Sequence, residues 1–236
     1  MIASDILVEA LSRGLPGDRL VVDPDVLAAI SHDDAEWAPT GQAAVGVRAR
    51  SEAEVQHVVR TCAELDAPIV PRGAGTGLSG GANAVGGCVI LDLSPMNQIL
   101  EIDPDNLLAV VQPGVINTDL KAAVAEHGLW YPPDPASAQW STIGGNVAAN
   151  AGGLCCLKYG VTRDYVLGLR AVVGGPVATE RRCAWGGAPP RASPGSTWWG
   201  CSSAPRARSA SARGAHRDDR PRGRREPAPA AGHSGG

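Results

Sequence analysis

The composition of the chain changes abruptly near residue 175, and this change limits where a folded core can form. The first 175 residues carry 10 basic and 20 acidic side chains, whereas the last 61 carry 11 arginines, four acidic residues, one valine and no leucine or isoleucine. So few large apolar side chains cannot bury enough surface to offset the entropy lost on folding. We therefore predict a folded core within residues 1–175 and a disordered tail over residues 176–236.

The chain as a whole has the profile of an ordinary soluble protein. It has 236 residues, a net charge of −3 and 44% hydrophobic residues, and no apolar run reaches the roughly 18 residues that a membrane span needs. The N-terminus lacks the basic start and apolar stretch of a secretory signal. Six irregularly spaced cysteines match neither a disulfide framework nor a zinc site. We expect a cytoplasmic protein without a bound metal.

Hydrophobic periodicity in the first part alternates between helix and strand, which indicates an α+β fold. Ser51 and Glu54 form a capping box ahead of regularly spaced apolar residues, so a helix is predicted over residues 51–65. A second amphipathic helix is expected over residues 118–127. Branched apolar runs between turn residues predict strands, at residues 88–93, 99–102, 107–112 and 166–173.

A glycine-rich stretch, PRGAGTGLSGG, occupies residues 71–81. Closely spaced glycines allow successive backbone N–H groups to converge on an anion such as a pyrophosphate. Gly75, Gly77 and Gly80 match the G-x-G-x-x-G pattern of dinucleotide-binding loops, but the helix that this motif must open does not follow. Taken alone, the stretch is as compatible with a plain glycine-rich turn as with a phosphate-binding loop.

A second stretch of small residues, YPPDPASAQWSTIGGNVAANAGG, occupies residues 131–153. Its prolines stiffen the chain before a run in which backbone can lie against a flat or bulky group. Hydroxyl and amide side chains in this run can both donate and accept hydrogen bonds. Taken alone, the stretch is better interpreted as the start of a tightly packed helix, with Ser141 or Thr142 as its N-cap.

Both stretches occur, together with ILDLS, VQPGV and KYG-TRDYVLGLRAV, in the order and spacing of a known family. Over residues 40–175 the chain resembles the PCMH-type FAD-binding domain of FAD-linked oxidases of the vanillyl-alcohol-oxidase type. The resemblance is greatest to the group that holds the glycolate oxidase FAD-linked subunit, D-lactate dehydrogenase and D-2-hydroxyglutarate dehydrogenase. It implies an FAD-binding domain of two small α/β subdomains, which follows a helical lead-in over residues 1–39.

This resemblance implies FAD-dependent dehydrogenation of a small 2-hydroxy acid such as glycolate or D-lactate. Some relatives tether FAD through a histidine in the first loop, but residues 71–81 contain none, so the resemblance implies non-covalent FAD. The implied cofactor-binding residues lie in the two stretches and are Pro71, Arg72, Gly73, Ala74, Gly75, Thr76, Gly77, Asp134, Pro135, Ser137, Ser141, Thr142, Gly144, Gly145, Asn146, Asn150 and Gly152.

No catalytic residue is assigned, because the family's substrate-binding groups lie in a C-terminal cap domain. We therefore expect the chain as written to be inactive. Two alternatives stay open: another PCMH-type flavoprotein, such as a relative of alkyl-dihydroxyacetone-phosphate synthase, and a non-catalytic or misfolded fragment that at most binds FAD.

The sequence departs from the family after Gly175. Tryptophan has a single codon, and a one-nucleotide shift of the reading frame allows Asp-Leu-Val-Gly where Thr-Trp-Trp-Gly stands at residues 197–200. The same shift from Val177 onward permits the family's closing segment, VGSEGTLG included. We predict that residues from about Pro176 are a frameshifted translation. The rival interpretation, a basic arm that binds nucleic acid, is weaker because misread GC-rich codons also yield Arg, Ala, Pro, Gly and Ser.

Overall fold

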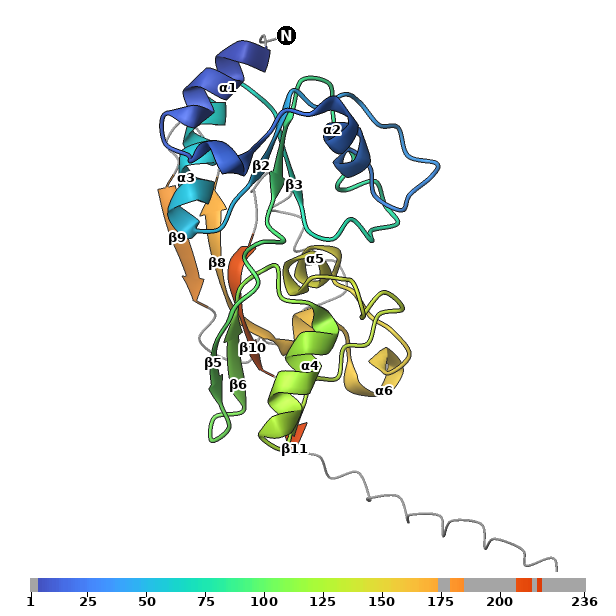
Figure 1. The fold of residues 1–236 in the computed structure, drawn as a ribbon. Helices are drawn as coiled ribbons and strands as arrows, with labels where there is room; N and C mark the ends of the chain where they lie inside the picture. The colour runs from blue at the N-terminus through green and yellow to red at the C-terminus, as the bar shows by residue number, and fades with distance from the viewer. Residues whose placement is uncertain (1–3, 174–178, 185–206, 214–215, 218–236) are drawn as a thin grey trace, which may run out of the picture.

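Two β-sheets with helices packed against them form the structure, which is a computed structural model that describes residues 4–173, 179–184, 207–213 and 216–217 (Figure 1). The first sheet and its helices occupy the upper part of Figure 1, and most of the second sheet lies below them. This mixed arrangement confirms the predicted fold class. The predicted helices and strands of residues 51–173 are found within one or two residues of their expected bounds.

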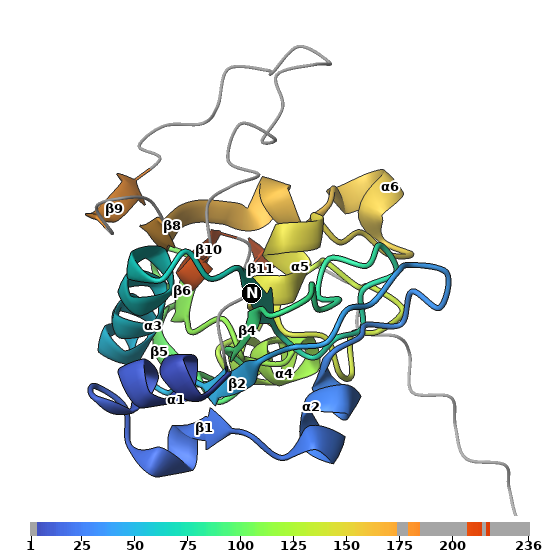
Figure 2. The ribbon, with the colours of Figure 1, turned by 90° about the horizontal axis from the view of Figure 1, so that it is seen from above.

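The first sheet has four strands in the order β1 (Leu20–Val21), β2 (Val45–Arg48), β4 (Val89–Asp92) and β3 (Ile69–Arg72). Strands β2, β4 and β3 run parallel, and β1 pairs with β2 in the antiparallel sense. Helices α1 (Ser4–Ser12) and α3 (Glu52–Glu64) lie beside each other on one face, and α2 (Pro24–Ile30) lies apart from both (Figure 2). A short 3-10 turn, η1 (Gly17–Arg19), precedes β1.

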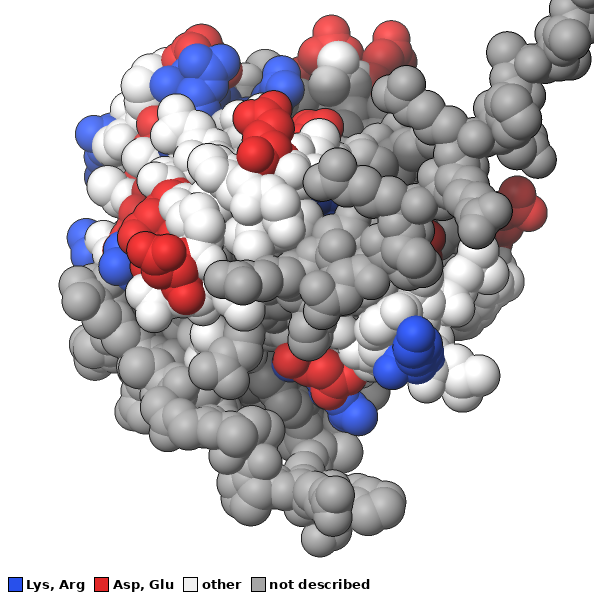
Figure 3. Space-filling model, turned by 90° about the horizontal axis from the view of Figure 1, so that it is seen from below, with Lys and Arg blue, Asp and Glu red and all other residues white. Residues whose placement is uncertain are grey.

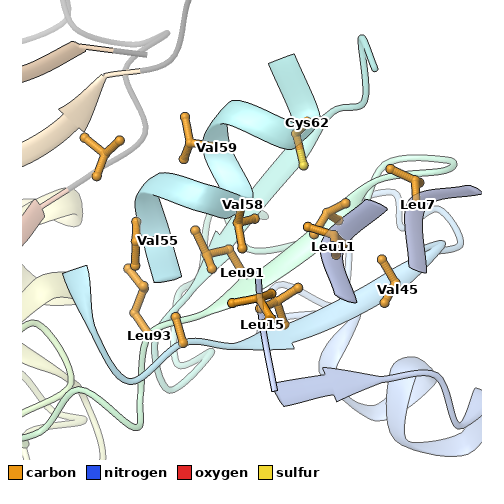
Figure 4. Packing of buried hydrophobic residues seen from close by; sticks show 14 of the residues in the cluster. Leu7, Leu11, Leu15, Val45, Val55, Val58, Val59, Cys62, Leu91 and Leu93 are labelled. Atoms are coloured by element: carbon orange, nitrogen blue, oxygen red, sulfur yellow. The ribbon is translucent and has the colours of Figure 1, made fainter. Parts of the chain in front are cut away.

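Helix α3 begins where its capping signal predicts. Ser51 is the N-cap, and its Oγ accepts a hydrogen bond of 3.3 Å from the main-chain N–H of Glu54. The carboxylate of Glu54 accepts from the main-chain N–H of Arg50, one residue before the position that a capping box predicts. The apolar side of the helix is buried: Val58 meets Leu91 and Leu11 between α1, α3 and the sheet (Figure 4).

The predicted lead-in shares this core. Leu7, Leu11 and Leu15 are buried in the same cluster as Val45, and the segment supplies strand β1 as well as helices α1 and α2. Residues 4–38 are therefore packed into the first half of the molecule.

The second sheet has five antiparallel strands, in the order β5 (Ile99–Asp103), β6 (Leu108–Val111), β10 (Ala207–Arg213), β8 (Val166–Val173) and β9 (Thr179–Ala184). Helices α4 (Asn117–Glu126) and α5 (Ile143–Ala149) pack against it through a core that includes Val111, Leu120 and Ile143. The remaining elements are β7 (Leu129–Trp130), α6 (Cys156–Tyr159), η2 (Thr162–Tyr165) and β11 (His216–Arg217), which pairs with β7.

Three segments within the predicted tail are strands in the structure, and the disorder of the tail as a whole stays a prediction. Strand β10 is inserted between β6 and β8, where main-chain hydrogen bonds on both sides can hold it without large apolar side chains. The other residues of the predicted tail lie outside the described residues. The shifted reading frame stays a prediction, which the nucleotide sequence of the codons for Val173 to Val177 would test.

The surface and the helices of the described residues give two further observations. No helix in these residues is long and apolar enough to cross a membrane. On the face seen from below, the Lys and Arg side chains form separate groups, several with acidic side chains beside them (Figure 3).

Candidate cofactor-binding site

The two small-residue stretches meet at Gly73 and Thr142, although they belong to different sheets. Gly73 follows β3 of the first sheet, and Thr142 precedes α5, which packs on the second sheet and lies where the two halves of the molecule join (Figure 1). A Cβ atom on Gly73 would overlap the Oγ1 atom of Thr142. The glycine thus permits a close approach of backbone that any other residue would prevent. The two stretches therefore lie in contact at this point.

The first stretch, which we call the glycine loop (Pro71–Gly81), carries a run of main-chain N–H groups without acceptors. Within the described part of the chain, no N–H from Gly73 to Gly81 donates a hydrogen bond to a protein atom. Gly75 and Gly80 have φ values of 80° and 70°, which only glycine adopts readily. Free N–H groups in such a loop form a concave anion-binding site, so the loop has the chemistry that a pyrophosphate requires.

Arg72 shapes the glycine loop from the end of β3. Its Nη1 donates a 2.6 Å hydrogen bond to the main-chain oxygen of His32, and its guanidinium packs directly against Gly75, where a side chain would clash. Burial lowers the pKa of Arg72 from its ordinary value, and the charges of Asp92, Asp33 and Asp34 oppose that change. The guanidinium therefore lies among protein acceptors and carboxylates and holds the loop in shape.

The segment before β2 supports the glycine loop from behind, which the sequence did not indicate. The main-chain N–H of Asp33 donates to Oδ1 of Asn83 at 2.8 Å, and the Asp33 carboxylate accepts from the N–H of Ala82 at 3.4 Å. The N–H of Asp34 donates to the oxygen of Gly75 at 3.1 Å. These partners are 41 to 50 residues apart, so no local pattern could have identified them.

The second stretch, which we call the second loop (Tyr131–Gly153), contains a helix start, as its sequence alone predicts. Thr142 is the N-cap of α5, and its Oγ1 accepts from the N–H of Gly145 at 3.3 Å. Gly144 packs against Pro113, whose Cβ would lie 2.6 Å from a side chain at this position. The N–H groups of Ile143 and Gly144 donate to the oxygens of Val115 and Pro113. The VQPGV segment therefore fixes the start of α5.

Three buried side-chain atoms near this helix start have no hydrogen-bond partner within the described residues: Ser141 Oγ, Asn146 Nδ2 and Asn117 Oδ1. Buried polar atoms nearly always have a partner in native proteins, so such atoms indicate a bound water or ligand. Ser141 and Asn146 are among the predicted site residues, whereas Asn117 is not.

Other predicted residues of the second loop already have protein partners. Asp134 forms an ion pair with Lys121. Asn150 ends α5 in the left-handed conformation, with φ at 49°, and its Oδ1 accepts from the N–H of Arg163 at 3.0 Å. Gly152 lies against Cys156, whose Sγ would be 3.5 Å from a Cβ at this position. These residues shape the wall of the loop, and their roles toward a cofactor stay predictions.

The residues present fit FAD. Free N–H groups of the glycine loop suit a pyrophosphate, and the small residues and orphaned polar atoms of the second loop suit a flat ring system with polar edges. The described residues contain no group of three or more His, Cys, Asp or Glu side chains that could hold a metal ion.

Comparison with known proteins defines the class. Residues 43–175 match the FAD binding domain family. The chain is 55% identical over 124 residues to glycolate oxidase subunit GlcD of Bacillus subtilis (strain 168), covering 52% of this chain and 26% of that protein. It is 42% identical over 155 residues to D-lactate dehydrogenase of Anaerostipes hadrus, covering 66% of this chain and 32% of that protein.

Solved structures show the same fold. An alkyldihydroxyacetonephosphate synthase aligns with a TM-score of 0.75 at 20% identity, covering 89% of this chain and 40% of that one. The p-cresol methylhydroxylase with bound substrate aligns with a TM-score of 0.73 at 21% identity, covering 89% and 43%. These likenesses confirm the PCMH-type fold.

The chain is a member of the FAD binding domain family, and FAD is its cofactor. It spans about a quarter to a third of the length of the curated relatives named above.

Proposed function

We propose that this chain is the FAD-binding part of an oxidoreductase that oxidises a small 2-hydroxy acid such as glycolate or D-lactate. The observation that carries the proposal is the contact between Gly73 and Thr142, which joins a loop of free N–H groups to a helix start lined by orphaned polar atoms. The names of the relatives support the substrate class, since they include a glycolate oxidase subunit and a D-lactate dehydrogenase.

The roles of the residues follow from their chemistry. When bound, FAD supplies the hydride acceptor for oxidation of the carbon that bears the hydroxyl group. The N–H groups from Gly73 to Gly77 would hold the pyrophosphate, and Ser141 and Asn146 would offer polar contacts to the rest of the cofactor. Because the glycine loop contains no histidine, we propose that FAD is held without a covalent bond.

Titration of the purified chain with FAD tests this proposal. We expect a yellow protein that keeps its flavin absorbance through gel filtration and loses it on denaturation, since non-covalent FAD leaves the unfolded chain. ADP, which carries the pyrophosphate without the flavin ring, is expected to compete. A folded protein that stays colourless at saturating FAD would contradict the proposed function.

Anaerobic addition of glycolate or D-lactate to the FAD-loaded chain tests the predicted inactivity. Bleaching of the flavin by either acid would contradict that prediction and support the substrate class directly. The alternative of an alkyldihydroxyacetonephosphate synthase-like protein has support from fold alone, because its identity to the solved structure is 20%.

A further inference from the structure

One buried residue of helix α4 holds both ends of the segment that we call the proline arch (residues 133–141). The side-chain amide of Asn117 donates to the main-chain oxygen of Pro133 at 3.4 Å. The main-chain N–H of the same residue donates to the oxygen of Ser141 at 3.0 Å. Asn117 is fully buried. One residue therefore fixes the distance between the two ends of the arch.

A short antiparallel pairing brings Asn117 and Ser141 opposite each other. Ile116 and Thr142 form an isolated antiparallel bridge, and Asn117 and Ser141 are the next opposed pair. Opposed residues in antiparallel pairs have neighbouring side chains. Both carry a buried polar atom without a partner in the described part of the chain, Oδ1 of Asn117 and Oγ of Ser141. Asn117 thus lies directly beside Ser141, a predicted cofactor-binding residue.

The first turns of α4 hold the middle of the arch as well. The main-chain N–H of Thr118 donates to the oxygen of Ala138 at 3.2 Å, and Lys121 forms an ion pair with Asp134. The lysine pair is partly exposed, and such pairs contribute little. The amide of Asn117, by contrast, is a fully buried side-chain contact to the arch.

We propose that Asn117 is a positioning residue of the FAD site. By holding Pro133 and Ser141 together, it keeps the proline arch in the shape that receives the cofactor. The inference rests on the proposed function and extends it to a residue that lies outside both small-residue stretches.

Two variants of neighbouring residues test the inference. Asn117→Ala removes the amide but keeps the main-chain bond to Ser141, whereas Thr118→Ala on the same turn keeps its main-chain bond to Ala138 and serves as the matched control. Loss of a buried hydrogen bond with its acceptor left unpaired is expected to weaken FAD binding about tenfold in Asn117→Ala, and Thr118→Ala is expected to match the wild type.

Two further readouts separate positioning from general stability. Amide hydrogen exchange is expected to speed up over residues 134–141 in Asn117→Ala, and the visible absorption spectrum of saturated FAD is expected to change its fine structure. A residue that only stabilised the fold would lower the melting temperature and leave the spectrum unchanged. Wild-type FAD affinity, spectrum and exchange in Asn117→Ala would overturn the inference.

If Asn117→Ala does not fold, Asn117→Asp replaces it, because aspartate keeps the size and an acceptor oxygen but loses the donor to Pro133. The same loss of affinity and faster exchange are expected, and wild-type behaviour would overturn the inference. If the wild-type chain folds but does not bind FAD, the proposed function fails. Amide hydrogen exchange over residues 134–141 then tests by itself whether Asn117 holds the proline arch: faster exchange in the variant supports this role, and wild-type exchange contradicts it.

Discussion

At the scale of single residues, Thr142 serves two purposes with one oxygen atom. Its Oγ1 caps α5 by accepting from the N–H of Gly145, and the same atom occupies the space that a side chain on Gly73 would need. The glycine loop and the second loop therefore touch through an atom that the helix cap has already oriented. Any group added at residue 73 must displace the cap, the loop or both.

Gly73→Ala is expected to weaken FAD binding and to lower the free energy of unfolding by about 1–3 kcal/mol, the usual cost of overpacking. The added methyl group would overlap Thr142 Oγ1. FAD titration and urea unfolding measure the two effects. Gly81→Ala is the control, because a Cβ there meets nothing within 4 Å. Equal behaviour of the two variants would show that the contact between the loops does not matter.

At the scale of elements, the sequence predicts those helices and strands whose signals are carried by residues close together in the chain. The cap at Ser51 and the branched runs place α3 and the strands, because neighbouring residues carry those signals. Strand β1 has two residues, and β10 consists of Ala, Arg and Ser, so neither has an apolar pattern to detect. Main-chain pairing with the neighbouring strands makes them elements of the fold.

The same distinction between local and long-range signals explains which parts of the candidate site the sequence predicts. Glycine spacing and small residues identify both stretches, whereas the supports of the site depend on long-range contacts. Asp33 bonds to Asn83 across 50 residues, and Asn117 looks like an ordinary helix start until its contacts with Pro133 and Ser141 are seen. Sequence therefore identifies the stretches that form the candidate site better than the scaffold behind them.

Cys62, on the buried side of α3, is expected to make the protein less stable as the pH rises through the alkaline range. Burial, with a smaller contribution from Cys88, raises the pKa of the Cys62 thiol from its ordinary value of 9.0 to about 12. The unfolded chain loses this proton near pH 9, whereas the folded chain keeps it to about pH 12. The stability from the neutral thiol is therefore complete below pH 9 and is lost as the pH rises from 9 to 12.

Urea unfolding at several pH values between 8 and 11 checks this expectation. We expect the wild type to lose stability steadily above about pH 9, and Cys62→Ala to lose less over the same range. Burial also raises the pKa of Tyr131, so part of the loss is expected to remain in the variant. Parallel pH profiles for the two proteins would mean that Cys62 is not the group responsible.

At the scale of the whole molecule, the folded unit begins earlier than the family match. That match starts at residue 43, but Leu7, Leu11 and Leu15 are buried in the first core and Asp33 supports the glycine loop. Residues of this segment thus contribute both to the core and to the support of the candidate site.

Deletion of residues 1–39 is expected to abolish cooperative unfolding and FAD binding. Each buried leucine contributes about 1.5–3 kcal/mol, so three of them approach the total stability of about 5–15 kcal/mol of a typical protein. Thermal melting by circular dichroism and FAD titration measure the outcome, with deletion of residues 1–3 as the control. A shortened chain that melts cooperatively with FAD bound would show that the lead-in is dispensable.

The contact between Gly73 and Thr142 joins two halves that each have their own sheet and core. A cofactor that contacts both halves stabilises both of them through its binding energy, whereas without the cofactor each half can unfold locally on its own. FAD binding would then determine how the protein is degraded. The FAD-bound protein resists proteases throughout, whereas the FAD-free protein is cleaved first in the half that opens more often.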